Sequence, residues 1–247
     1  LLLELNKYPD LESDIIEMTT DGTVLRSWDI ADIIRTAMID GGDDPSAFVR
    51  QGDDWFHNNS ATYWAARNEL VISGREDFVI GIGYDDHEIK WILGDPDKAW
   101  FTYPSLRAFA LDLLDGTHPP IGEHAVSITS NGRLMLFDNG YASFAHSPAG
   151  SSRGVSMPRQ YVINERKRTA TEVWSYEHSP AVWSPICSSI YQYGSSYLVD
   201  YASEDGGIRL VGLNVDNTVG FEYKISGSNY SWGWNALPIN FGAIRFR

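Results

Sequence analysis

The chain has 247 residues, of which 43% are hydrophobic and 13% aromatic, so one large all-β domain with a sizeable core could use its whole length. The formal net charge of −14 and the lack of any run of lysine and arginine argue against a nucleic-acid partner. The single cysteine excludes an internal disulfide, and no apolar stretch reaches the roughly 18 residues of a membrane span. The sequence begins with Leu1, which is consistent with a leader or an N-terminal region that precedes it.

The first half of the chain alternates between short strands and tight turns. Two strands are predicted around the Asp-Gly turn of residues 13–30, and four strands are predicted over residues 60–94. Between these units, apolar residues of 30–37 share one helical face, and Gly41 is placed to end that helix. A second short helix is predicted over residues 105–114.

The second half repeats the strand pattern. Residues 124–140 read as a hairpin with an Asn-Gly turn, residues 159–177 as a second hairpin, and residues 184–225 as a further unit. Each unit of the chain closes on an aromatic residue in a similar strand: Trp28, Trp91, Trp174 and Phe221. Such repeats predict a β-propeller with blades of four antiparallel strands, and a β-sandwich is the alternative. The units do not obviously close a ring, so we expect blades to be missing from residues 1–247 or supplied by a partner, and a homo-oligomer is possible.

Two histidines break the strand pattern in the same way. His57 and His124 each stand at the start of the first strand of a unit, and first strands line the central channel of a propeller. We therefore expect the two imidazoles to converge near the axis. No third histidine shares their register, so a catalytic zinc site is not predicted, and no nucleotide-binding loop or nucleophile elbow is present. The sequence thus predicts no metal and no cofactor.

Arginines supply a second candidate group. Arg153 and Arg159 precede or open an outer hairpin, and Arg75 follows a strand of the second unit. Histidine and arginine without a metal suit the transfer of an anionic group such as sulfuryl or phosphoryl, because a guanidinium offers forked donors to oxyanions. The alternative is that these arginines pair with acidic residues, which outnumber the basic ones 33 to 19.

The sequence resembles the PAPS-independent arylsulfate sulfotransferases of bacteria. The resemblance runs over about residues 54–189 and is carried by "DWFHNNS" (54–60), "ELVISGR" (69–75), "IKWILGD" (89–95), "GEHAVSITSNGRLMLFDNG" (122–140), "SRG…YVINE" (152–165) and "EVWSYEHS…WSPICSS" (172–189). It implies a six-bladed propeller, usually preceded by a small β domain, so residues 1–247 would form a partial propeller without that domain and the early blades. It also implies a periplasmic or secreted protein.

The resemblance further implies transfer of a sulfuryl group from a phenyl sulfate to a phenol through a sulfated histidine, without nucleotide or metal. By motif, His57 and His124 match two family histidines that hold the sulfuryl oxygens or protonate the departing phenolate, and the family arginine falls near Arg153 or Arg159. The family nucleophile is a third histidine, but Arg209 of "EDGGIRLVG" stands at the place where we expect it. An arginine stays protonated and cannot attack sulfur.

Three outcomes follow from that departure: attack by His57 or His124, direct transfer between donor and acceptor, or binding without turnover. Our hypothesis is an axial pocket that holds a phenolic sulfate ester and a phenol acceptor. The alternative is a non-catalytic propeller that binds aryl sulfates or other anionic aromatic ligands. In both cases four further residues are predicted to contact the ligand: Asn59, Arg209, Trp55 and Tyr63.

Overall fold

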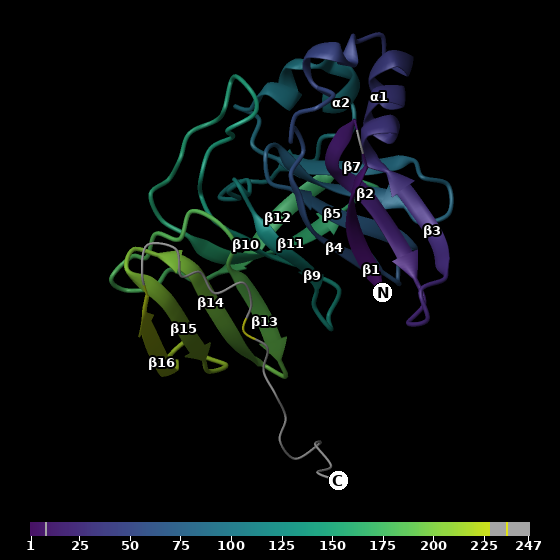
Figure 1. Cartoon of the computed structure of the whole chain (residues 1–247). Coiled ribbons are helices and arrows are strands. Elements are labelled where there is room, and N and C mark those ends of the chain that lie inside the picture. The colour runs from purple at the N-terminus through teal and green to yellow at the C-terminus, as the bar shows by residue number, and fades with distance from the viewer. Residues whose placement is uncertain (8, 228–235, 237–247) are drawn as a thin grey trace.

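Antiparallel sheets dominate the regular secondary structure of the protein, a computed structural model that describes residues 1–7, 9–227 and 236 (Figure 1). The N-terminal sheet contains β1 (Leu2–Lys7), β2 (Asp10–Met18) and β3 (Val24–Asp29). The second sheet contains β4 (Asn58–Trp64), β5 (Glu69–Gly74), β6 (Phe78–Gly83) and β7 (Ile89–Gly94). The third contains β9 (His124–Ile128), β10 (Leu134–Asp138), β11 (Met157–Asn164) and β12 (Thr169–Ser175), with the short β8 (Asp112–Leu113) parallel to β12. The fourth contains β13 (Ser189–Tyr193), β14 (Ser196–Glu204), β15 (Gly207–Leu213) and β16 (Val219–Ser226).

Glycine turns connect strands where the sequence predicted them. Gly22 turns the chain between β2 and β3 with a φ of 92°, and Gly132 does so between β9 and β10 with a φ of 74°. Each glycine allows a left-handed conformation that other residues rarely adopt. The aromatic residues that close the four repeats lie in the last strand of each sheet: Trp28, Trp91, Trp174 and Phe221.

The helices agree with the sequence in part. Helix α1 (Ile30–Asp40) begins where Asp29 caps the N–H of Asp32 at 2.8 Å, and Gly41 follows its last residue, as predicted. The prediction of a helix over residues 105–114 is wrong, because α2 spans only Pro104–Arg107. Beyond it the N–H of Asp112 donates to the carbonyl of Arg168 at 2.8 Å, which draws the chain onto the edge of the third sheet as β8. Two 3₁₀ turns, Pro45–Ala47 and Ala99–Thr102, complete the helical segments that the structure describes.

The hydrophobic core lies between consecutive sheets. Successive side chains of a strand point to opposite faces, so the buried strand β5 directs Leu70 and Ile72 to the core shared with the N-terminal sheet and α1, and Val71 to the core shared with the third sheet. In β10, Leu136 likewise faces the second sheet, whereas Phe137 joins the core shared with the fourth sheet. Sheets that pack face to face in chain order are the blades of a propeller.

The first strands of consecutive sheets lie side by side. β1 contacts β4, β4 contacts β9, and β9 contacts β13, and Figure 1 shows these strands gathered toward the middle of the molecule. The prediction of an all-β propeller fold with four-stranded antiparallel blades is therefore confirmed. No helix in the described residues has the length and apolar character needed to cross a membrane.

Candidate active site

A cavity of about 1000 Å³ opens where the first strands of the sheets begin. Its wall includes Glu4 and Glu12 of the N-terminal sheet, residues 57–60 at the start of β4, residues 124–127 of β9 and residues 186–191 at the start of β13. Five non-glycine residues of this wall have a left-handed backbone, with φ between 45° and 79°: Glu12, His57, Ala125, Cys187 and Ser188. Such conformations are costly for these residue types and often mark functional sites. The same strained feature therefore recurs near the start of the first strand in the second, third and fourth sheets, and it also occurs in β2.

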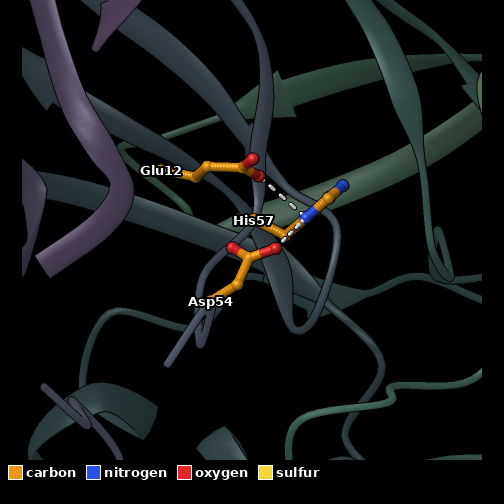
Figure 2. Close-up of side chains that lie close together, drawn as sticks. All are labelled: Glu12, Asp54 and His57. Atoms are coloured by element: carbon orange, nitrogen blue, oxygen red, sulfur yellow. Dashed lines mark hydrogen bonds and ion pairs between the residues drawn. The ribbon is translucent and has the colours of Figure 1, made fainter. Parts of the chain in front are cut away.

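His57 is held by two carboxylates on one ring nitrogen. Its Nδ1 is hydrogen-bonded to Asp54 Oδ2 and lies 2.9 Å from Glu12 Oε2, and Figure 2 shows the other ring nitrogen on the side away from both acids. Among the described residues Nε2 has no hydrogen-bond partner. The hydrogen bond that His57 donates to Asp54 raises the pKa of His57 above its usual value, although burial opposes the rise. This pairing fixes the proton on Nδ1 and leaves the Nε2 lone pair of the neutral ring available.

His124 is bonded at both ring nitrogens. Nδ1 donates to Asn139 Oδ1 at 2.9 Å, with the carbonyl of Gly122 at 3.2 Å, while Nε2 accepts the N–H of Cys187 at 3.2 Å. The Asn139 amide is oriented in turn, because its Nδ2 donates to the carbonyls of Ser184 at 2.7 Å and Cys187 at 2.9 Å. Burial lowers the pKa of His124 to about 4, so the ring is neutral near pH 7. It joins the start of β9 to the start of β13.

Arg75 is a buried cation in the cavity wall, with 2% of its surface exposed. Its guanidinium donates to Glu76 Oε1 at 2.5 Å and to the carbonyl of Ala142 at 3.2 Å, and it stacks on the Phe144 ring at 3.8 Å. Glu76 also accepts hydrogen bonds from three donors of the segment 143–145. Burial opposes ionisation of Glu76, but Arg75 and these donors together hold its pKa below the usual value. The pair is therefore ionised and rigidly placed.

Acidic residues make up much of the remaining wall. Asp53 pairs with Arg50, with Oδ2 2.8 Å from Nε, as Asp54 pairs with His57. Burial raises the pKa of Glu4 to about 7 and also raises that of Glu12. The acids are thus either paired or partly protonated near neutral pH, which limits their repulsion of an anionic ligand.

Glu12, Asp54 and His57 could in principle hold a metal ion, because their ligand atoms lie within 4.8 Å of one another. The nitrogen that faces the acids is Nδ1, and it must carry a proton to donate to Asp54. A metal ion at this place would have to displace that proton, because a histidine nitrogen that binds a metal is deprotonated.

Comparison with known proteins decides the family. The sequence matches the model of the arylsulfotransferase (ASST) family over residues 5–226. The chain belongs to the arylsulfotransferase family. Arylsulfate sulfotransferase AssT of Escherichia coli is 32% identical over 161 residues, which cover 58% of this chain and 26% of that protein. AssT of Lelliottia amnigena is 29% identical over 156 residues, covering 56% and 25%.

The matched part thus spans about a quarter of the length of these arylsulfotransferases. Among solved structures, a europium-containing methanol dehydrogenase is 12% identical, with a TM-score of 0.43 and coverage of 88% of this chain and 41% of that chain. BamB from Moraxella catarrhalis is 10% identical, with a TM-score of 0.32 and coverage of 92% and 69%.

Four of the candidate residues named from the sequence line the cavity: His57, His124, Asn59 and Arg75. The Asn59 amide is used within the wall, since its Nδ2 donates to the carbonyl of Glu123 at 2.7 Å. Arg209, which we expected at the place of the family nucleophile, lies elsewhere: it belongs to β15, pairs with Glu204 and Glu222, and does not line the cavity.

The two arginines predicted to bind the anion also lie outside the cavity wall. Arg159 is 1% exposed and bonds to Asp138 and Glu172, both at 2.7 Å. Arg153 bonds to the same Asp138 and to the carbonyl of Pro119. Because one buried carboxylate binds both guanidinium groups, they are held within the third blade.

Neither of the aromatic residues predicted to contact the ligand, Trp55 and Tyr63, lines the cavity. Trp55 is fully buried in the core between the N-terminal and second sheets, where its ring packs on Phe48 and Phe56. Tyr63 lies near the far end of β4, and its hydroxyl donates to Asn68 at 2.9 Å. The residues that sequence reasoning passed over are Asp54, Asn58 and Asn139. Asp54 stands three residues before His57, a spacing that could have indicated the pairing.

Proposed function

We propose that this chain transfers a sulfuryl group from a phenolic sulfate ester to a phenol within the cavity, without a nucleotide. The observation that carries the proposal is the Asp54–His57 pair, whose Nε2 is free among the described residues, in the wall of a cavity that also contains the buried cation Arg75. Membership of the arylsulfotransferase family supports the choice of sulfuryl as the transferred group. An extracytoplasmic location, periplasmic or secreted, belongs to the same proposal.

His57 acts as the nucleophile in this proposal. The lone pair of neutral Nε2 attacks sulfur, the bond between sulfur and the aryl oxygen breaks, and the phenolate leaves with that electron pair and takes a proton from water. The acceptor phenol then loses its proton to water and attacks sulfur, and the N–S bond breaks to return the electron pair to Nε2. Asp54 keeps its hydrogen bond to Nδ1 in both steps and offsets the positive charge that the substituted ring carries.

His124 has a different role, because both of its nitrogens already bond to the protein. It fixes the backbone around Cys187 and so shapes the part of the cavity wall that precedes β13. A second function follows from the expectation that Arg209 replaces the third family histidine: the chain binds aryl sulfates without turnover.

Turnover of a chromogenic aryl sulfate with phenol as acceptor tests the proposal. His57→Ala should abolish transfer, and mass spectrometry after addition of donor should find a sulfated peptide containing His57 in the unaltered protein only. His118→Ala is the matched control, because His118 lies outside the cavity and 62% of its side chain is exposed. Equal rates for His57→Ala and the unaltered protein would refute the role of His57. Tight binding of the ester without turnover would instead favour the binding function.

A further inference from the structure

Phe144 is an exposed aromatic residue in the wall of the cavity, with 65% of its surface open to solvent. In the described part of the chain, the other phenyl or phenol ring that lines the cavity belongs to Tyr191. Ligand pockets are typically lined by such rings. Single exposed apolar residues are also common on protein surfaces, so the evidence for a function lies in how this ring is held.

The loop that carries Phe144 is anchored on both sides of the ring. Glu76 Oε2 accepts hydrogen bonds from the Phe144 N–H at 2.6 Å and from two further donors of the segment 143–145. His146, which is buried, donates from Nε2 to the carbonyl of Phe48 at 3.0 Å. These buried anchors fix the backbone, so the Phe144 ring is held in the cavity and is not packed into a core.

Two side chains fix the plane of the ring. The Arg75 guanidinium lies over the Phe144 ring at 3.8 Å from its centroid, and the Tyr141 ring meets it at 4.8 Å and 89°, an edge-to-face contact. Arg75 also links the ring to the reaction centre, because its backbone N–H donates to the carbonyl of His57 at 3.1 Å. Phe144 is therefore a preorganised apolar surface on the His57 side of the cavity.

We propose that Phe144 is the platform on which the aryl ring of the donor ester and of the acceptor phenol stacks, and that it selects aromatic over aliphatic substrates. This inference rests on the proposed function, because it takes the ligands to be those of that reaction. Stacking removes apolar surface of both rings from water, and a ring that is already fixed loses little freedom on binding. Phe144 takes the role that the sequence suggested for Trp55 and Tyr63, which do not line the cavity.

Calorimetric titration tests the platform, carried out in a His57→Ala background so that no turnover occurs. Phe144→Ala should weaken binding of 4-nitrophenyl sulfate and of phenol about 5- to 30-fold each, since it removes both the stacking and the buried area. Binding of methyl sulfate, which carries the same anionic group without a ring, should stay within about twofold of the reference. Phe144→Trp, which keeps an aromatic face, should retain the affinity for both aryl ligands within about threefold.

Tyr223→Ala is the matched control for Phe144→Ala. Tyr223 lies in β16, is 63% exposed and does not line the cavity. Its replacement removes an aromatic ring of similar exposure and should leave the affinities for all three ligands unchanged. Because Phe144 is itself exposed, Phe144→Ala should fold like the reference, which circular dichroism checks.

Unchanged affinity for the aryl ligands in Phe144→Ala would overturn the inference, and so would an equal loss of affinity for methyl sulfate, which would indicate a general disturbance of the cavity. A reference protein that binds 4-nitrophenyl sulfate no more tightly than methyl sulfate would overturn it as well. The titration needs no chemistry, so its result is independent of the turnover assay. A chain that binds aryl ligands through Phe144 but shows no transfer would retain the platform and lose the proposed function.

Discussion

Acidification should destabilise the folded chain through His124, and His124→Asn should remove that contribution. Burial lowers the pKa of His124 to about 4 from the usual 6.5, so the unfolded chain takes up the proton first as the pH falls. The stability that the neutral ring contributes is therefore complete above pH 6.5 and is lost as the pH falls toward 4. Linkage between these two values gives a loss of about 2.5 kcal/mol at about pH 4.5.

Urea denaturation at about pH 7 and about pH 4.5 measures this effect. Asparagine at position 124 can still donate toward Asn139 but cannot be protonated. The free energy of unfolding of the unaltered chain should therefore exceed that of His124→Asn by about 2.5 kcal/mol less at the acidic pH than at neutral pH. Glu123 and Asp200, whose pKa values burial raises to about 7, contribute pH dependence of the opposite sign, and they contribute it equally to both proteins.

His87→Asn serves as the control, because His87 lies outside the cavity and its left-handed backbone, with a φ of 61°, is one that asparagine tolerates. This variant should leave the pH dependence as it is in the unaltered chain. A difference between the unaltered chain and His124→Asn that stays constant within about 0.5 kcal/mol from neutral to acidic pH would refute the reasoning. The His124 ring would then not be held neutral by its surroundings.

Two further variants examine the network around the histidines. Asp54→Asn should lower the pKa of His57, since the hydrogen bond to Asp54 is the largest cause of its rise, and an NMR titration of the imidazole measures this change. The same variant should reduce the rate of transfer about tenfold or more, because the ring loses its orientation, and initial rates measure that loss. An unchanged titration curve would show that Glu12 alone sustains the shift. Asn139→Ala removes three buried hydrogen bonds and should cost about 2–4 kcal/mol in urea denaturation, whereas a cost under about 1 kcal/mol would mean that water replaces them.

The blades could be predicted from local sequence because each signal acts over a few residues. The Asn-Gly turn at 131–132 and the alternation in β5 determine which residues turn and which face a core, whatever the rest of the chain does. The convergence of His57 and His124 followed from the same register, since both stand where a first strand begins. The helix predicted at 105–114 failed because its second half is drawn onto the edge of the third sheet by a distant strand.

The arginines could not be assigned because their partners are distant in sequence. Arg159 and Arg153 both bind Asp138, which is 21 and 15 residues away, and only the paired sheet brings them together. Arg75 looked equivalent to them in the sequence, but its carboxylate is the adjacent Glu76, and this pair is buried beside β4. The sequence shows that acidic residues are numerous enough to pair with every arginine. It does not show which carboxylate each arginine binds.

In the proposed reaction, the electrostatic environment of His57 would let an acidic chain bind and transfer an anion. Asp54 raises the pKa of His57 and so favours the protonated ring, which cannot attack, but the same carboxylate favours the cationic ring formed when Nε2 carries sulfuryl. Arg75 acts in the opposite direction on the free ring, because its charge opposes the pKa rise and favours the neutral form. An anion bound at Arg75 would partly cancel that effect, so attack on sulfur has to follow from orientation as well as from charge. The fixed geometry of His57, Asn58 and Arg75 along one sheet edge supplies that orientation.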